Sequence, residues 1–316
     1  MLKIMIKPKC LKKGDKVALL APSSPVDEEK LELSIESVRF IGLEPVLYPS
    51  CTMKHGYLAG QDFARAMDLN AAFADDKIKG IFCLRGGYGL MRILSMLDYK
   101  VIKKNPKLLL GYSDITALHT VLNKLCKLVT LHSPMPTRGW NTLDPLSLKC
   151  LTDNIFASEA MGAAPSVPDE PIETIYPGQA EGLITGGNLS LLAGTLGSSY
   201  EINTKGKILF IEDVDEKNYR IDKGLTALAL AGKFEDCAGI ILGTWANCGD
   251  PDVPPEDNLT LTEIFNEVVR PFKKPTINNF RAGHIYPQIS FPMGVRTRLD
   301  ATNKTVTFLE AGTTHK

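Results

Sequence analysis

The first half of the chain alternates short apolar runs with amphipathic segments, and this alternation restricts the fold more than any other feature. The amphipathic segments have the apolar spacing of helices and lie at residues 27–41, 62–73, 90–97 and 115–125. The apolar runs lie at residues 17–21, 45–48, 78–84, 108–110 and 128–131. Strands that alternate with helices build right-handed βαβ units around a mostly parallel sheet. We therefore predict an α/β fold whose N-terminal part is a mostly parallel sheet flanked by helices.

The second half of the chain has more β character and follows a change in composition. Residues 157–180 are rich in Ala, Gly and Pro, which is typical of a linker. Beyond them, helices are expected at residues 189–195, 221–231 and 261–269. Strands are expected at residues 207–211, 239–242, 276–279, 295–299 and 305–309. The predicted organisation is an N-terminal domain at 1–156, a linker at 157–180 and a C-terminal domain at 181–316.

The bulk composition argues against several classes of protein. Lys+Arg and Asp+Glu both total 36, so no net charge attracts the chain to nucleic acid or to an anionic membrane. The seven cysteines are scattered and never form a Cys-x-x-Cys pair, which disfavours structural zinc and a disulfide framework. The apolar run at 17–21 is too short for a signal peptide, and no segment approaches the length of a transmembrane helix. We expect a cytoplasmic protein with neither a nucleic-acid nor a membrane partner.

A possible nucleophile lies in the tetrad Gly111-Tyr112-Ser113-Asp114, between an apolar run and a helical segment. A strand, a sharp turn and a helix in this order expose a serine hydroxyl and aim backbone N–H groups at its target. The hydroxyl is a weak nucleophile unless a base and an orienting carboxylate lie near it. Alternatively, Ser113 only caps the helix, a position that serine favours. The tetrad alone leaves both interpretations open.

Among the histidines, His284 is the best candidate for the base, because it lies in a polar loop marked by Gly283 and Pro287. His119 follows Ser113 by six residues on the same helix, so its side chain should point elsewhere. His132 ends an apolar strand, where a structural role is expected. The other two histidines are His55 and His315, the latter in a polar C-terminal tail.

Candidates for the orienting acid follow the buried-looking strand at 207–211. Glu212 and Asp213 stand at its carboxyl end, and either one could hold an imidazole nitrogen. Asp215 and Glu216 are better explained as an acidic surface turn. Four carboxylates within five positions also suggest a divalent metal site, but neither a calcium loop nor a His-x-x-x-His spacing supports it.

A glycine-rich loop, Arg85-Gly86-Gly87-Tyr88-Gly89, follows the strand expected at 78–84. It should lie at the same edge of the sheet as the tetrad, since the carboxyl ends of parallel strands share one edge. Glycines let backbone N–H groups approach either a phosphate or a developing oxyanion closely. The loop matches neither G-x-G-x-x-G nor a P-loop, and its spacing does not separate the two uses.

Taken in order, these motifs resemble the LD-carboxypeptidase family of serine peptidases. This family includes murein tetrapeptide carboxypeptidases and microcin C self-immunity peptidases. Each motif is weak alone, but their joint order over nearly the whole chain is specific. The segments that carry the resemblance are residues 21–25, 83–89, 111–114, 209–213, 283–284 and 291–294.

The resemblance implies a Ser-His-Glu triad divided between the two domains. Ser113 would be the nucleophile, His284 the general base and then acid, and Glu212 the group that orients the imidazole. The backbone N–H groups of Gly87 and Asp114 would form the oxyanion hole. The resemblance further implies a cytoplasmic homodimer that needs no metal or organic cofactor.

The activity implied is hydrolysis of the L-to-D peptide bond that releases terminal D-alanine from murein tetrapeptides during cell-wall recycling. Arg85 is a candidate for binding the terminal carboxylate, because a guanidinium matches a carboxylate bidentately. A structural salt bridge is the alternative role for Arg85. The third residue of the substrate, lysine or diaminopimelate, stays open.

Three other functions are compatible with parts of the pattern. A microcin C immunity-type peptidase would cleave aminoacyl-nucleotide conjugates and would need an aromatic surface, for which the tryptophans are Trp140 and Trp245. A non-catalytic muropeptide-binding protein would not need Ser, Glu and His together. A glutaminase-like amidotransferase would carry cysteine where Ser113 stands.

Overall fold

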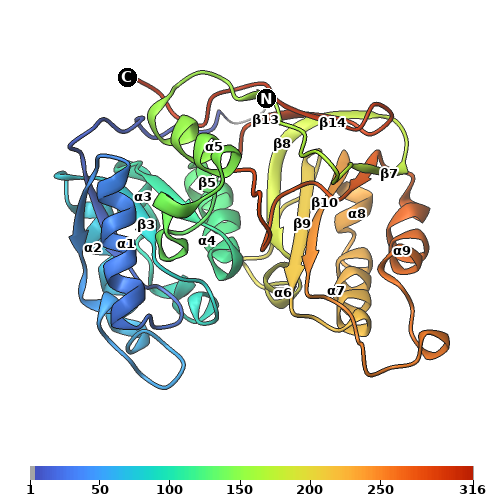
Figure 1. Ribbon diagram of the computed structural model, residues 1–316, viewed down its shortest axis with the longest axis horizontal. Coiled ribbons are helices and arrows are strands. Elements are labelled where there is room, and N and C mark those ends of the chain that lie inside the picture. Colours follow the sequence, from blue (N-terminus) through green and yellow to red (C-terminus); the bar gives the residue numbers. More distant parts are fainter. Residues whose placement is uncertain (1–3, 316) are drawn as a thin grey trace. The chain divides into compact units, whose positions relative to one another are not determined.

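Residues 4–315 are described by the computed structural model, and they form two units (Figure 1). The first unit contains the chain up to residue 160 together with residues 289–294 and 311–315. The second unit contains residues 161–288 and 295–310. The ends of the predicted domains, residues 1–3 and 316, lie outside the described part. Each unit is described below by itself.

In the described part of the first unit, six strands form one sheet in the order β12-β5-β4-β3-β1-β2. Strands β1 to β5 are parallel to their neighbours, and β12 pairs with β5 in the antiparallel direction. The predicted mostly parallel sheet is therefore confirmed. Its strands are β1 (Lys16–Leu20), β2 (Glu44–Leu47), β3 (Ile78–Cys83), β4 (Leu108–Gly111), β5 (Thr130–His132) and β12 (Phe291–Met293).

Helical segments connect the strands of the first unit. The segment at 90–97, expected as an amphipathic helix, forms a 3-10 helix, and the segment at 115–125 is divided into an α-helix and a π-helical turn. The α-helices are α1 (Glu28–Phe40), α2 (Asp62–Ala74), α3 (Tyr99–Lys104), α4 (Thr116–Val121) and α5 (Pro145–Phe156). The shorter or irregular turns are η1 (Pro49–Cys51), η2 (Leu90–Met96), η3 (Ser113–Ile115), η4 (Leu122–Cys126), η5 (Pro136–Arg138) and η6 (Trp140–Thr142).

Helix α1 shows how the sequence specifies these elements. Asp27 accepts the N–H of Lys30 at 2.8 Å and caps the helix, since a free N–H at a helix start needs an acceptor. Leu31, Ile35 and Val38 recur at helical spacing and are buried. Each such side chain contributes roughly 1.5–3 kcal/mol when it leaves water.

The described residues of the second unit form an eight-stranded sheet in the order β6-β14-β13-β8-β9-β10-β11-β7. Strands β8 to β11 are parallel, and the flanking strands are antiparallel to their neighbours. The parallel strands are β8 (Gln179–Asn188), β9 (Ile208–Val214), β10 (Gly239–Ala246) and β11 (Thr276–Asn278). The flanking strands are β6 (Gly162–Ala163), β7 (Glu173–Tyr176), β13 (Arg296–Asp300) and β14 (Thr305–Phe308).

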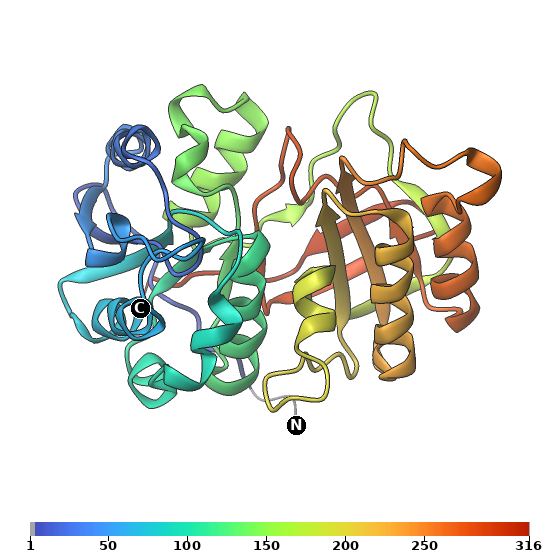
Figure 2. The same cartoon turned by 90° about the horizontal axis from the view of Figure 1, so that it is seen from below.

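Helices α6 (Leu189–Gly194) and α7 (Asn218–Leu230) cover one face of β9 and β10, as Figure 2 shows in yellow and orange. Alternate strand residues, among them Leu209, Ile211 and Leu242, pack in one cluster with these helices. Because successive side chains of a strand point to opposite faces, Phe210 and Glu212 lie on the other face. The remaining helical segments are α8 (Lys233–Asp236), α9 (Leu261–Ile264), η7 (Pro255–Asp257), η8 (Phe265–Val269) and η9 (Arg270–Phe272).

The units divide the chain differently from the domains expected from composition. Residues 157–180, expected as a linker, contain β6 and β7, which pair with β14 and β11. Residues 289–294 return to the first unit, where β12 pairs with β5. None of the described helices combines the length and the apolar character needed to span a membrane.

Candidate active site

Ser113 occupies a sharp turn directly after β4. Its backbone φ is +65°, a left-handed conformation that residues other than glycine adopt only when the surrounding structure imposes it. Tyr112 before it is extended and stands at the N-cap of η3, where no side-chain capping bond is formed. The strand, strained turn and helix correspond to the arrangement that presents a nucleophilic serine.

Hydrogen bonds hold the turn on both sides of Ser113. Asp114 is 1% exposed, and its Oδ2 accepts the N–H of Leu90 at 2.9 Å. Burial raises the pKa of Asp114, while the Ser23 hydroxyl and the Leu90 N–H act in the opposite direction. On the other side, the carbonyl of Gly111 accepts the N–H of Ser133 at 3.2 Å. The backbone conformation at Ser113 is therefore fixed from two neighbouring elements.

The glycine loop lies against the serine. A Cβ placed on Gly86 would lie 2.9 Å from Cβ and 3.0 Å from Oγ of Ser113, and 3.2 Å from the backbone N of Asp114. Only a residue without a side chain fits against Ser113 at these distances. Gly87 has φ of +91° and is exposed. Ser113, Asp114 and both glycines thus lie at one edge of the first unit's sheet.

Arg85, the candidate for carboxylate binding, is exposed beside this loop. Its Nη1 donates to the carbonyl of Pro25 at 3.0 Å. Within the described residues it forms no ion pair, so the structural salt bridge considered as its alternative role is not found there. The guanidinium keeps further N–H donors, since arginine carries five of them.

In the second unit, Glu212 and His284 form a hydrogen-bonded pair. Nδ1 of His284 lies 2.9 Å from Oε2 of Glu212. The Glu212 side chain is 0% exposed, and that of His284 is 11% exposed. Burial raises the pKa of Glu212, and the bond from His284 opposes this shift. A carboxylate in this position fixes the orientation and the tautomer of an imidazole.

Gly283 makes this pairing possible. Its φ is +128°, and a Cβ there would lie 2.8 Å from Oε2 of Glu212 and 2.7 Å from Oγ1 of Thr244. A residue with a side chain would be strained and would push the loop away from the carboxylate. The glycine before the histidine was therefore a sequence signal for a close approach.

Asp213, the competing candidate for the orienting acid, has a structural role. Its Oδ1 accepts from Nδ2 of Asn188 at 2.7 Å, and its Oδ2 accepts the N–H and hydroxyl of Ser190 at 3.0 and 2.9 Å. These bonds hold the start of α6 against β9. Strand alternation places Asp213 on the face opposite to Glu212.

The remaining acidic residues behave as the expected surface turn. Asp215 is exposed with φ of +56°, and Glu216 pairs with Arg220 at 3.5 Å. Among residues 4–315, no group of three His, Cys, Asp or Glu side chains is placed to hold a metal ion.

Two other histidines of the first unit are buried and structural. This was expected of His132. The expectation that His119 points away from the Ser113 tetrad is wrong, because its ring reaches the carbonyl of Gly111, the first residue of the tetrad. Nε2 of His119 donates to the carbonyl of Gly111 at 2.9 Å, and its Nδ1 lies 2.8 Å from Oγ1 of Thr130. Burial lowers the pKa of His119 to about 4. His132 stacks on the ring of Phe291 at 5.0 Å.

The tryptophans have different surroundings. Trp140 is 0% exposed, and its indole N–H donates to the carbonyl of Pro134 at 3.2 Å. It therefore offers no surface for stacking a base. Trp245 is half-buried in the second unit and packs against Phe265, with ring centroids 5.2 Å apart.

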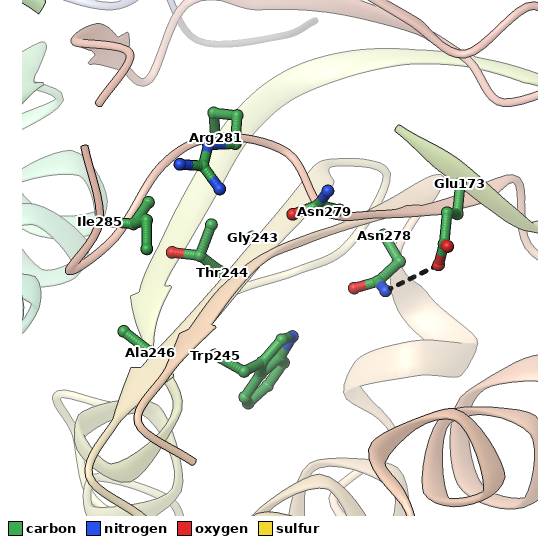
Figure 3. Close-up of a pocket in the computed structure, with 9 residues that line it drawn as sticks. All are labelled: Glu173, Gly243, Thr244, Trp245, Ala246, Asn278, Asn279, Arg281 and Ile285. Atoms are coloured by element: carbon green, nitrogen blue, oxygen red, sulfur yellow. Dashed lines mark hydrogen bonds between the residues drawn. The ribbon is translucent and has the colours of Figure 1, made fainter. Parts of the chain in front are cut away.

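A pocket of about 350 Å³ lies in the second unit beside the His284 loop (Figure 3). Sequence reasoning did not find it, because its walls come from three separate segments. They are the carboxyl end of β10, the chain from β11 to residue 285, and β7. The lining residues are Glu173, Gly243, Thr244, Trp245, Ala246, Asn278, Asn279, Arg281 and Ile285.

An elbow serine beside backbone N–H groups and a buried carboxylate–histidine pair are the parts that serine hydrolases use. Comparison with known proteins agrees with this class. The model of the LD-carboxypeptidase N-terminal domain matches residues 17–133, and that of the LD-carboxypeptidase C-terminal domain matches residues 181–299. The chain belongs to the LD-carboxypeptidase family.

Individual relatives cover nearly the whole chain. A probable murein peptide carboxypeptidase of Bacillus subtilis is 40% identical over 97% of this chain and 95% of its own length. The murein tetrapeptide carboxypeptidase of Pseudomonas aeruginosa is 31% identical over 88% of this chain and 91% of its own. A solved structure of an MccF-like protein from Bacillus anthracis is 27% identical, with a TM-score of 0.87 over 96% of this chain and 99% of its own.

Proposed function

We propose that this protein is a serine-type LD-carboxypeptidase that releases terminal D-alanine from murein tetrapeptides. The observation that carries the proposal is the 2.9 Å hydrogen bond between buried Glu212 and His284. The strained turn at Ser113 and the relatives named as murein peptide carboxypeptidases support it. The resemblance further leads us to place the enzyme in the cytoplasm, in cell-wall recycling, as a homodimer without a metal or organic cofactor.

In the proposed reaction, Oγ of Ser113 attacks the carbonyl carbon of the residue before D-alanine. His284 takes the hydroxyl proton, and Glu212 stabilises the imidazolium that forms. The negative charge that develops on the carbonyl oxygen is stabilised by the backbone N–H groups of Gly87 and Asp114.

Collapse of this intermediate breaks the peptide bond, and His284 gives its proton to the departing amine of D-alanine. The acyl group stays on Ser113 as an ester. Water then attacks the ester, with His284 again acting as base, and the shortened peptide leaves with a new carboxylate.

Arg85 is proposed to bind the free carboxylate of the terminal D-alanine. Its guanidinium is exposed beside the glycine loop and donates to the Pro25 carbonyl through one nitrogen. The planar fork of its other N–H groups matches a carboxylate. This contact would restrict the enzyme to the last peptide bond of its substrate.

The test is D-alanine release from purified murein tetrapeptide by the wild-type protein and by Ser113→Ala. We expect kcat to fall by about 10⁶-fold in the variant, as when a serine protease loses its nucleophile. Ser166→Ala, which changes an exposed serine, is the matched control and should retain the wild-type rate. Equal rates for Ser113→Ala and the wild type would contradict the triad.

The same experiment separates the alternative functions. A folded wild-type protein that releases no D-alanine would be assayed on aminoacyl-nucleotide conjugates, the substrates of the alternative peptidase. Tight binding of the tetrapeptide without turnover would instead indicate a muropeptide-binding protein.

A further inference from the structure

The segment at residues 21–25 carries part of the family resemblance, but the proposed reaction gives it no role. In the first unit it directly follows β1, which pairs with β3 in the sheet. The glycine loop at 85–89 follows β3, so both segments leave the same edge of the sheet from neighbouring strands. Hydrogen bonds join the two segments, and Ser24 takes part in two of them.

The backbone N–H of Ser24 fixes the direction of the peptide group between Gly86 and Gly87. This N–H donates to the carbonyl of Gly86 at 3.1 Å. The peptide group is trans and planar, so its carbonyl and its N–H point in opposite directions. With the carbonyl directed at Ser24, the N–H of Gly87 points away from Ser24, and the described residues contain no acceptor for it. This N–H is therefore available to a bound molecule.

The hydroxyl of Ser24 holds the next peptide group. Its Oγ accepts the N–H of Tyr88 at 3.2 Å. A Cβ on Gly87 would overlap this Oγ, so Gly87 passes directly against the serine, with φ of +91°. Two consecutive glycines can adopt many conformations, and contacts from outside the loop must select one of them. Ser24 supplies such contacts to both peptide groups that flank the Cα of Gly87.

Other residues hold the two ends of the loop. At its start, Nη1 of Arg85 donates to the carbonyl of Pro25 at 3.0 Å. At its end, Nη1 of Arg65 donates to the carbonyl of Gly89 at 3.0 Å and also to the carbonyl of Pro22. The Arg65 side chain is 0% exposed, so these bonds are protected from water. None of them involves the serine hydroxyl, and the ends of the loop should stay in place when that hydroxyl is removed.

The middle of the loop faces the proposed nucleophile. A Cβ on Gly86 would approach both Oγ of Ser113 and the backbone N of Asp114. The peptide group that begins at Gly86 carries the N–H of Gly87, which is one of the two proposed oxyanion donors. Such a donor contributes most when it already points to the place where charge develops.

We propose that Ser24 is a positioning residue that directs the N–H of Gly87 toward the oxyanion. The proposal rests on the proposed serine peptidase function. The backbone N–H of Ser24 orients the first peptide group, and its hydroxyl prevents rotation of the second. Removal of the hydroxyl lets Gly87 reorient while the side chain of Ser113 keeps its place. The oxyanion exists only in the transition state and the intermediate, so kcat should fall and KM should not change.

The test measures kcat and KM on the tetrapeptide for the wild type, Ser24→Ala and Ser24→Thr. Ser24→Ala should lower kcat roughly 10- to 100-fold at constant KM, somewhat less than the loss of a complete oxyanion donor. Ser24→Thr keeps a hydroxyl and should restore most of the rate. Ser198→Ala is the matched control, since Oγ of Ser198 also accepts a backbone N–H, that of Tyr200 at 3.1 Å, in the loop before β9. Its kcat should equal that of the wild type.

A fluorophosphonate tests the same donor without any peptide. Oγ of Ser113 bonds to phosphorus and fluoride leaves, while negative charge develops on the phosphoryl oxygen. Ser24→Ala should slow this labelling by the same factor as it slows cleavage. The final extent of labelling counts the active sites, so a variant that is merely partly unfolded would show fewer sites, each with the wild-type rate.

The two assays separate this proposal from the proposed function. Slower labelling of Ser24→Ala, with no cleavage of tetrapeptide by the wild type, would support the positioning role and refute the proposed substrate. Wild-type rates in Ser24→Ala would overturn the proposal, as would a loss that lies wholly in KM or a Ser24→Thr variant as slow as Ser24→Ala. A wild type that is not labelled would overturn both. If Ser24→Ala does not fold, Ser24→Cys replaces it, because a thiol is a weak acceptor.

Discussion

Ser113 in the first unit is held by its backbone, whereas Glu212 and His284 in the second unit are held by a hydrogen bond between side chains. The serine has φ of +65°, and the neighbouring glycine at 86 lies against its hydroxyl. The acid and the histidine are joined at 2.9 Å in buried surroundings. Ser113 directly follows β4, whereas Glu212 lies within β9 near its carboxyl end and His284 lies in the loop after β11. The positions of the two sets depend on different forces.

This difference predicts how each unit responds to substitution. Where backbone conformation holds the catalytic residue, the rate should fall when a nearby substitution adds bulk and should change little when it only alters polarity. Where a side-chain hydrogen bond holds the pair, the rate should fall when a single atom of that bond is exchanged. The substitutions below test this contrast, beginning with the largest expected effect.

Glu212→Gln should lower kcat by about 10⁴-fold, because the amide keeps the shape of the carboxylate but favours the wrong imidazole tautomer. Folding should be little affected, since removal of a fully buried charge offsets the weaker hydrogen bond. The measurements are kcat on the tetrapeptide and the urea midpoint of unfolding.

Asp213→Asn is the control at the adjacent position. It weakens the bonds to Ser190 at the start of α6, so it should cost about 1–2 kcal/mol of stability and change kcat by less than about tenfold. A larger loss of kcat in Asp213→Asn than in Glu212→Gln would reverse the assignment of the two acids.

The sequence was most informative where buried strands are parallel. Such strands are covered on both faces and appear as continuous apolar runs, so β1 to β5 were all expected close to their observed positions. The turn at Ser113 was also recognisable, because the motif is local. Strand alternation also distinguishes Glu212 from Asp213, because neighbouring residues of a strand point to opposite faces of the sheet.

Elements that depend on distant partners could not be predicted. Strand β8 contains Gly182, Gly186 and Gly187, which weaken the apolar pattern of a central strand. Strand β12 has three residues, and its partner β5 lies about 160 positions earlier in the chain. Short edge strands such as β6 and β7 have the composition of a loop.

The candidate site shows the same limit. The glycine loop was recognised, but its contact with Ser113 joins residues 27 positions apart, so spacing alone could not separate a phosphate site from an oxyanion site. Arg281 lies in the polar loop that contains His284. Its pocket requires β10 and β7, which no local pattern connects to it.

Gly86→Ala tests the role of the backbone in the first unit. The added Cβ would lie 3.0 Å from Oγ of Ser113 and displace the hydroxyl, and a misplacement of about 1 Å typically costs about 10²-fold in rate. The backbone at Gly86 is not left-handed, so the added methyl group acts through crowding alone. We expect kcat/KM to fall by about 10²-fold, with a small change in the urea midpoint.

Gly206→Ala should have the opposite combination of effects, a loss of stability without a loss of activity. Its φ is +65° with open space around it, so alanine should cost about 1 kcal/mol of stability through strain and leave kcat/KM unchanged. Full activity in Gly86→Ala would show that the loop does not confine the serine.

The smallest effect concerns the pH dependence of the two units. His119 lies beneath the serine turn with its pKa lowered to about 4, against an ordinary value of 6.5. Between these values the unfolded chain binds more protons, so the free energy of unfolding of the first unit should decrease as pH falls. The full shift corresponds to about 3 kcal/mol. Glu212 has a raised pKa, so its contribution to the second unit has the opposite sign and is lost as pH rises above about 4.5.

Unfolding in urea at pH 7, 5.5 and 4.5 would separate the two contributions. In a Trp245→Phe background the fluorescence of buried Trp140 reports on the first unit. His119→Gln removes the titrating ring, so its deficit in stability relative to the parent should be largest at pH 7 and shrink as pH falls. If the free energies of unfolding of the Trp245→Phe parent and of His119→Gln changed in parallel with pH, the imidazole would not be held neutral. The serine turn would then lie over a charged group, in contrast to the neutral hydrogen-bonded support inferred from the contact with Gly111.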